Sequence, residues 1–134
     1  AVICVEPRNY QSSLADPLYR ELAEYIREVE RIRAELAEIL FLGNFHEDQG
    51  AEVQEAGGRA GGRALYYAVH AHPKNGRRAL VVANDSSQPR AYTWRFTEGG
   101  GARATLYVPY RKPRPAEAGE PLEIGGVGLH ILVG

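Results

Sequence analysis

The sequence predicts an α+β fold, in which an N-terminal strand and one long amphipathic helix precede an all-β antiparallel sandwich of six to seven strands. Three observations lead to this prediction. Residues 1–5 are a continuous apolar run, as in a strand buried on both faces. Between residues 18 and 40, apolar side chains recur every three or four positions. From residue 63 onward the apolar period becomes two, and Gly- or Pro-rich turns separate the short runs.

The helix is the clearest element of the sequence. It is expected to begin near Asp16-Pro17, because aspartate caps a helix N-terminus and proline suits the first helical position. Gly43 is the expected terminator after the C-terminal cap. The apolar stripe, which must lie against another surface, consists of Leu18, Leu22, Tyr25, Ile26, Val29, Ile32, Leu36, Ile39 and Leu40.

The β region is predicted from alternation and turn signals. Asn75-Gly76 lies between two alternating runs and is the strongest short-range signal for a β-hairpin. The segment from Lys112 to Pro121 is expected to be a turn region. Strands are predicted at residues 51–55, 63–71, 78–84, 90–97, 103–108, 122–124 and 129–133.

The strand–helix unit and the β region are predicted to be two unequal parts, residues 1–43 and 44–134. A lone strand and helix fit the edge of a larger α/β domain better than an independent fold. The chain also begins in mid-strand and contains no methionine, so we expect a piece of a longer polypeptide. The expected partner of the helix stripe is either a catalytic domain of the parent chain or a second copy of this chain.

Composition narrows the classes of function. The 134 residues carry a net charge of −1 with dispersed basic residues, which argues against nucleic acid as a partner. No apolar run approaches the roughly 20 residues of a membrane span, so no membrane partner is expected. The segment given has no signal-peptide layout, which slightly favours the cytoplasm. Cys4 is expected to be a buried free thiol. No cofactor motif is present, and none is expected.

Glu6 is the candidate catalytic residue. It directly follows the predicted strand, and catalytic carboxylates of β/α barrels lie at the carboxyl ends of strands. The alternative is a loop carboxylate paired with Arg8 or with solvent. A small hydrolase that uses Glu6 with His46, Glu47 or Asp48 is therefore one functional hypothesis.

Histidines offer a second hypothesis, a metal site. His70 and His72 are two residues apart on one predicted strand, and with His130 they could ligate zinc. The spacing is generic and matches no zinc motif, so solvated polar positions are the preferred interpretation. No metal is expected.

Aromatic residues suggest carbohydrate binding. Tyr92, Trp94 and Phe96 alternate along one strand and so share one face. If that face is exposed, Trp94 and Tyr92 would form a platform for sugar rings, with Tyr66 as a further candidate. If it faces inward, the same residues belong to the core, and the polar alternates Thr93, Arg95 and Thr97 favour this orientation.

The order of the elements, over nearly the whole chain, resembles that of a known class of proteins. A helix containing Leu22–Arg33 leads into Leu36–Phe45; a strand Arg78–Ser86 (RALVVANDS) follows, then Leu106–Tyr110 (LYVPY), a Pro-rich link, and a closing PLEIGGVGLHIL segment. This resembles the C-terminal region of multidomain bacterial glycoside hydrolases, where a small antiparallel β-sandwich follows a TIM-barrel catalytic domain.

The resemblance implies a non-catalytic C-terminal accessory domain of a glycoside hydrolase. Such a domain packs on and stabilises the catalytic barrel, and in some of these enzymes it contacts carbohydrate. It also implies that this chain alone has no hydrolase activity. The alternative is a free-standing carbohydrate-binding or protein-interaction β-sandwich.

Overall fold

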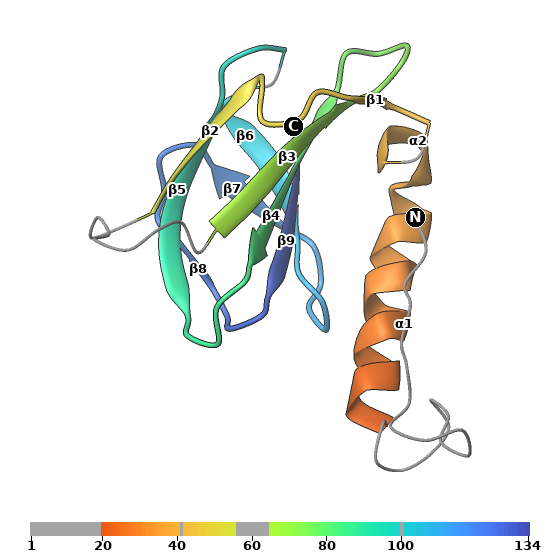
Figure 1. Ribbon diagram of the computed structural model, residues 1–134. Coiled ribbons are helices and arrows are strands. Elements are labelled where there is room, and N and C mark those ends of the chain that lie inside the picture. The colour runs from red at the N-terminus through yellow and green to blue at the C-terminus, as the bar shows by residue number, and fades with distance from the viewer. Residues whose placement is uncertain (1–19, 41, 56–64, 100) are drawn as a thin grey trace.

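The computed structural model describes residues 20–40, 42–55, 65–99 and 101–134 (Figure 1). The predicted strand at residues 1–5, with Cys4 and Glu6, lies outside the described residues. The helices are α1 (Arg20–Glu35) and α2 (Ala37–Leu40). The strands are β1 (Asn44–Phe45), β2 (Ala51–Glu55), β3 (Leu65–Ala71), β4 (Arg78–Asn84), β5 (Arg90–Phe96), β6 (Arg103–Tyr107), β7 (Arg114–Glu117), β8 (Leu122–Ile124) and β9 (Leu129–Val133).

The strands form two antiparallel sheets that face each other. The larger sheet has the order β1-β3-β4-β9-β6-β7, and the smaller has the order β2-β5-β8. Figure 1 shows α1 running alongside the larger sheet, on the face opposite to the smaller sheet. The molecule therefore has three layers: a helix, a six-stranded sheet and a three-stranded sheet. The α+β fold class with a β-sandwich is confirmed.

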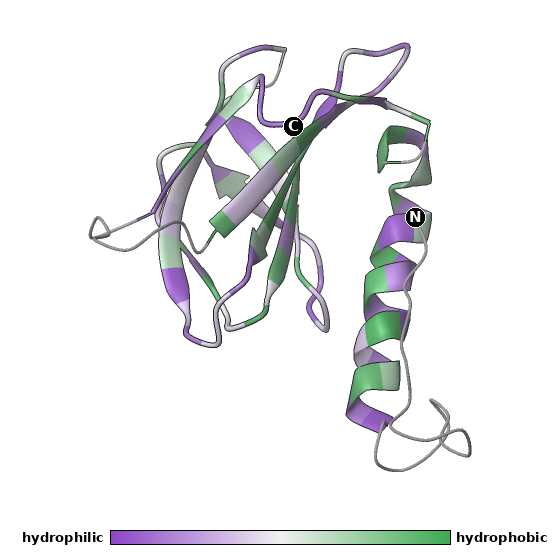
Figure 2. Ribbon diagram, viewed as in Figure 1, coloured by the Kyte–Doolittle hydropathy of each residue, from purple (hydrophilic) through white to green (hydrophobic). Residues whose placement is uncertain are grey.

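The main core lies between the two sheets. Alternation places Leu80 and Val82 of β4 and Leu132 of β9 inward, opposite Tyr92 and Trp94 of β5. Figure 2 shows that β4 and β9, at the centre of the larger sheet, are mostly hydrophobic. Both faces of these two strands are covered, which explains their nearly continuous apolar sequence.

The helix stripe is covered in part by the chain's own larger sheet. Ile32 of α1 and Ile39 of α2 are buried against Ala79, Ile131 and Val133, which point outward from β4 and β9. The first turns of α1 are less covered, since Leu22 is 40% exposed. The described part of the segment 1–43 thus packs directly on the β region.

Most predicted strands are confirmed, and two were missed. The bounds of β2, β4, β8 and β9 coincide with the predicted ranges. β7 lies in the expected turn region between Lys112 and Pro121. It was missed because it contains Pro115, and proline is unfavourable inside a strand. Among the described strands β7 pairs only with β6, and an edge strand tolerates proline because one side needs no N–H donors. β1 is two residues long, below the length at which alternation is visible.

The ends of the elements show where glycine is needed. The Asn75-Gly76 hairpin joins β3 and β4 as predicted, with Gly76 at φ 72°. Gly43 does not take the left-handed conformation expected of a helix terminator; a Cβ there would lie 2.2 Å from the Ile39 carbonyl oxygen and 2.6 Å from that of Ala71. Gly43 is required because the chain passes so close to α2 and β3.

Candidate functional site

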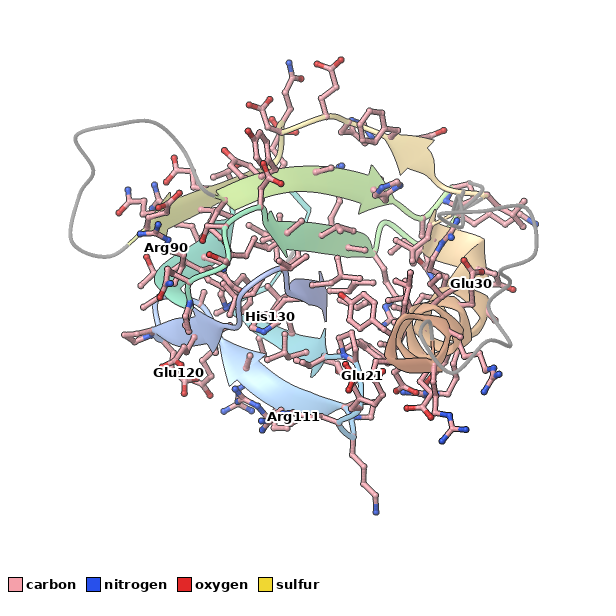
Figure 3. The ribbon with its side chains drawn as sticks, turned by 60° about the horizontal axis from the view of Figure 1, so that its bottom comes forward. Glu21, Glu30, Arg90, Arg111, Glu120 and His130 are labelled. Carbon is pink, nitrogen blue, oxygen red and sulfur yellow. The ribbon has the colours of Figure 1, made fainter. Side chains whose placement is uncertain are left out.

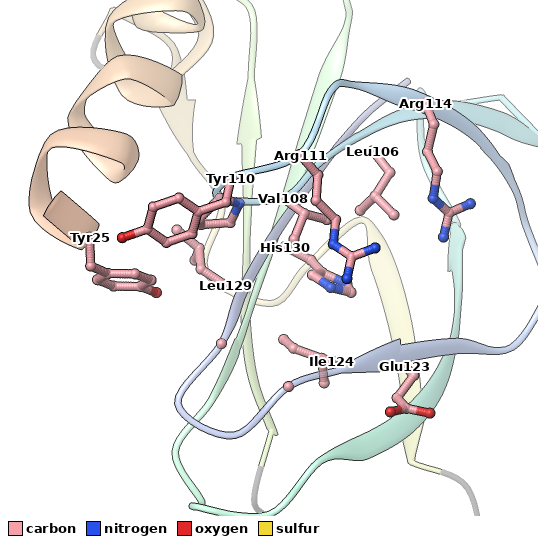
Figure 4. Close-up of a pocket in the computed structure, with 13 residues that line it drawn as sticks. Tyr25, Leu106, Val108, Tyr110, Arg111, Arg114, Glu123, Ile124, Leu129 and His130 are labelled. Carbon is pink, nitrogen blue, oxygen red and sulfur yellow. The ribbon is translucent and has the colours of Figure 1, made fainter. Parts of the chain in front are cut away.

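One pocket joins all three layers at the end of the sandwich near the first turns of α1. Its volume is about 440 Å³, within the usual range of small-molecule sites of roughly 300–1,000 Å³. We call it the arginine pocket (Figure 4). Its lining consists of Tyr25, Leu106, Val108, Pro109, Tyr110, Arg111, Arg114, Glu123, Ile124, Gly125, Gly128, Leu129 and His130.

His130 forms the floor of the arginine pocket and is held there by a buried hydrogen bond between the two sheets. His130 of β9 is 5% exposed, and its Nδ1 lies 2.7 Å from the hydroxyl oxygen of Tyr92 on β5. Figure 3 shows His130 in the interior between the sheets, whereas Glu30, Arg90 and Glu120 lie at the periphery. Burial raises the pKa of Tyr92, so its hydroxyl stays protonated.

The helix and the β6–β7 loop form one side of the pocket. The backbone N–H of Tyr110 donates to the Glu28 carboxylate at 3.0 Å, and the rings of Tyr25 and Tyr110 lie 6.3 Å apart. The Tyr25 hydroxyl donates to the carbonyl of Val127, in the β8–β9 turn, at 3.4 Å. These contacts fix the loop and the turn against the helix, and Tyr110 remains 61% exposed.

Backbone strain is concentrated beside the pocket. Tyr110 has φ 67° and Val127 has φ 51°, in the left-handed region that side-chain-bearing residues seldom adopt. For the β-branched Val127 this conformation is especially unfavourable. Strain of this kind persists where surrounding contacts enforce it, commonly at binding sites. In this protein it shapes two of the segments that border the arginine pocket.

Two arginines supply most of the charge at the pocket. Arg111 lies in the β6–β7 loop and Arg114 begins β7, and within the described residues neither is in an ion pair. Glu123 of β8 is the acidic side chain among the described lining residues. Burial, with Arg114 and Arg111 as further causes, lowers the pKa of His130 to about 4.

The depressed pKa of His130 predicts a pH-dependent stability. Unfolded His130 takes up a proton near pH 6.5, whereas folded His130 resists protonation until about pH 4. Proton binding therefore favours the unfolded state. Neutral His130 contributes about 3 kcal/mol to the free energy of unfolding above pH 6.5, and this contribution is lost as the pH falls from 6.5 to 4. Urea unfolding between pH 4 and 7 measures it, with His130→Gln as the reference that lacks this component. A folded-state pKa near 6.5, measured by NMR, would contradict the prediction.

Two of the three sequence-predicted sugar contacts are in the core. Tyr92 is 0% exposed and Trp94 is 1% exposed, so the alternating aromatic face points inward and offers no platform for a sugar ring. This corrects the hypothesis of an exposed strip: both rings fill the space between the sheets, and Trp94 packs edge-on against Phe96. Tyr66 is 54% exposed, but it lies on β3, outside the arginine pocket.

The hypothesis of a hydrolase that uses Glu6 with His46, Glu47 or Asp48 cannot be built from the described residues. Glu6 lies outside them, so its surroundings are not described. His46, Glu47 and Asp48 follow β1, where the backbone of His46 and Glu47 continues the pairing with Val69. The backbone of His46 and Glu47 thus has a structural role at the sheet edge.

The three histidines of the metal hypothesis are dispersed. The ring of His70 packs in a tilted orientation against that of Phe45, with ring centroids 5.3 Å apart. His72 Nε2 lies 3.2 Å from a Glu38 carboxylate oxygen, and His130 lies in the arginine pocket. Across the part of the chain that the structure describes, no three His, Cys, Asp or Glu side chains form a group able to hold a metal ion.

A second groove of about 440 Å³ crosses the smaller sheet, lined by Glu52, Gln54, Thr93, Arg95 and neighbouring residues. Its two charged groups neutralise each other, since Arg95 Nε donates to the Glu52 carboxylate at 2.7 Å. The groove also has no exposed aromatic ring among its described lining residues. The arginine pocket is therefore the stronger candidate site.

Comparisons with known proteins identify no relative of this chain. No family model matches the chain, and neither a curated protein nor a solved structure matches it. Among the described residues, no helix is long and apolar enough to cross a membrane.

Proposed function

We propose that this chain is a non-catalytic accessory module that binds a saccharide in the arginine pocket. The observation that carries the proposal is the Tyr25–Tyr110 pair, in which an exposed ring stands beside a pocket of polar side chains. Sugar rings have apolar C–H faces that pack on aromatic rings, and hydroxyls that hydrogen-bond to polar groups. The pocket provides both kinds of surface.

The polar lining favours binding over hydrolysis. Glycoside hydrolysis ordinarily requires two carboxyl groups that flank the scissile bond, roughly 5–9.5 Å apart. Among the described residues that line the pocket, Glu123 supplies a single carboxylate. His130 is neutral and a weak base at neutral pH, because its pKa is about 4. These features suit recognition of a ligand that leaves unchanged.

The resemblance to the C-terminal region of multidomain bacterial glycoside hydrolases supports the accessory role. In those enzymes the trailing sandwich packs on a catalytic barrel and in some cases contacts carbohydrate. The exposed Leu22 near the start of α1 is a further apolar contact available to such a neighbour. Saccharide binding by the isolated chain, however, depends only on the pocket.

We expect a Tyr110→Ala variant to bind saccharide about tenfold more weakly than the wild type, because it loses the exposed stacking ring. Isothermal titration with a panel of neutral and acidic mono- and disaccharides measures the effect. Tyr66→Ala is the matched control, since Tyr66 is similarly exposed but lies outside the pocket. Absence of binding across the panel, or equal losses in the two variants, would overturn the proposal.

A further inference from the structure

The floor of the arginine pocket presents a hydrogen-bond donor. The buried Tyr92 hydroxyl has His130 Nδ1 as its partner among the described residues. If Nδ1 carried the proton, the hydroxyl hydrogen of Tyr92 would be left without an acceptor, which is costly for a buried group. The proton of His130 therefore lies on Nε2. No described residue accepts it, so this N–H is available to whatever occupies the pocket.

The side chains above the floor are also donors. Arg111 and Arg114 each present a planar guanidinium fork, and no described carboxylate pairs with either. Figure 4 shows Arg111 and Arg114 reaching over the pocket from the β6–β7 segment, with Glu123 on the strand across from them. Arginine forks match the two oxygens of a carboxylate in geometry and charge. Among the described lining residues, one carboxylate faces two guanidinium groups, so the part of the pocket at Arg111 and Arg114 has an excess of positive charge and of N–H donors. The carboxylates of α1, Glu21, Glu24 and Glu28, act instead on Tyr110 at the helix side.

We propose that the saccharide bound here is acidic, a sugar carrying a carboxylate such as a uronic acid, and that Arg111 and Arg114 bind this carboxylate. His130 Nε2–H donates to the same ligand, and Tyr110 packs against the sugar ring. This inference rests on the saccharide-binding function proposed above and specifies the ligand class.

The His130 ring reports on the charge of the ligand. It lies among Tyr92 of β5, Arg111 and Arg114 of the β6–β7 segment, and Glu123 of β8. A bound carboxylate offsets the two guanidinium charges that disfavour the imidazolium, so the pKa of His130 rises on binding. A neutral sugar in the same place adds no charge, so it leaves the effect of the two guanidinium charges on the pKa of His130 unchanged.

The test compares glucuronate with its methyl ester, which has the same ring and hydroxyls but no charge. Isothermal titration of the full chain gives the affinities, and NMR titration of the His130 ring gives its pKa with and without each ligand. We expect glucuronate to bind at least tenfold more tightly than the ester and to raise the pKa of His130. The preference is lost in the Arg111→Gln/Arg114→Gln variant. It is retained in Arg103→Gln, which removes one arginine charge from an exposed β6 position outside the pocket.

Each other outcome overturns a defined part of the account. Equal affinities for acid and ester, both weakened by Tyr110→Ala, would refute the acidic-sugar inference and leave saccharide binding standing. Acetate or inorganic phosphate binding as tightly as glucuronate would refute the sugar and indicate a simple anion site. Absence of binding by glucuronate, the ester and the saccharide panel would refute both proposals.

Discussion

We expect Trp94→Ala to lower the free energy of unfolding by about 3–5 kcal/mol, the usual range for removing a large buried aromatic side chain. Trp94 is 1% exposed and occupies the space between the sheets, where it contacts Phe96 edge-on. Its truncation leaves a cavity that the surrounding strands cannot fill, because paired strands restrain one another. Urea unfolding followed by far-UV circular dichroism measures the loss.

If Trp94→Ala does not fold, a second variant, Trp94→Phe, still tests the prediction. Trp94→Phe retains an aromatic ring and removes the indole N–H, which is buried without a hydrogen-bond partner among the described residues. We expect it to cost clearly less than the alanine variant, since the cavity is smaller and the unpaired donor is gone. A fully exposed indole in the folded wild type, detected by acrylamide quenching, would contradict the buried placement.

We expect Ile32→Ala to lower the free energy of unfolding by about 2–5 kcal/mol. Ile32 lies on α1 and is completely buried against Ala79, Ile131 and Val133 of the larger sheet. The loss therefore measures how strongly the helix layer is attached to the sheet. Because α1 also positions Tyr25 and the Glu28 contact to Tyr110, the variant is expected to weaken ligand binding too.

Leu22→Ala is the matched control on the same helix. Leu22 is 40% exposed, so its truncation is expected to cost no more than about 0.5–1 kcal/mol. Both variants are measured under identical denaturant conditions. Equal effects of the two substitutions would mean that α1 is not packed on the sheet as described.

The fold was largely predictable because its elements have strong local patterns. The Asn75-Gly76 turn signal is followed by the alternating run from Arg78 to Asn84. Together they place the β3–β4 hairpin correctly. The helix was predicted as continuous to residue 40, but it is interrupted at Leu36, where Ile39 N–H donates to the Leu36 carbonyl at 3.1 Å. Neither glycine nor proline marks that interruption in the sequence.

The aromatic strand shows what periodicity cannot decide. A period of two establishes that Tyr92 and Trp94 share a face, but not whether that face is inside. The polar alternates Thr93 and Arg95 favoured the inward orientation, and the structure has it. The sugar-platform hypothesis for these rings therefore ends with their burial.

The arginine pocket was not predictable from sequence spacing. Tyr92 and His130 are 38 residues apart, and Glu28 and Tyr110 are 82 residues apart. Only the packing of the three layers brings them together. One local signal was present, the basic run Arg111-Lys112-Pro113-Arg114 directly after an aromatic residue, which marks a loop with unpaired positive charge.

The most direct test of the account is to map where a saccharide binds. Two-dimensional NMR of the labelled chain, titrated with glucuronate, identifies the residues whose amide signals shift. The account predicts the largest shifts in residues 110–111, 123–125 and 128–130, which surround the arginine pocket. Shifts confined to the outer face of β3 around Tyr66, or to the groove across β2 and β5, would contradict it.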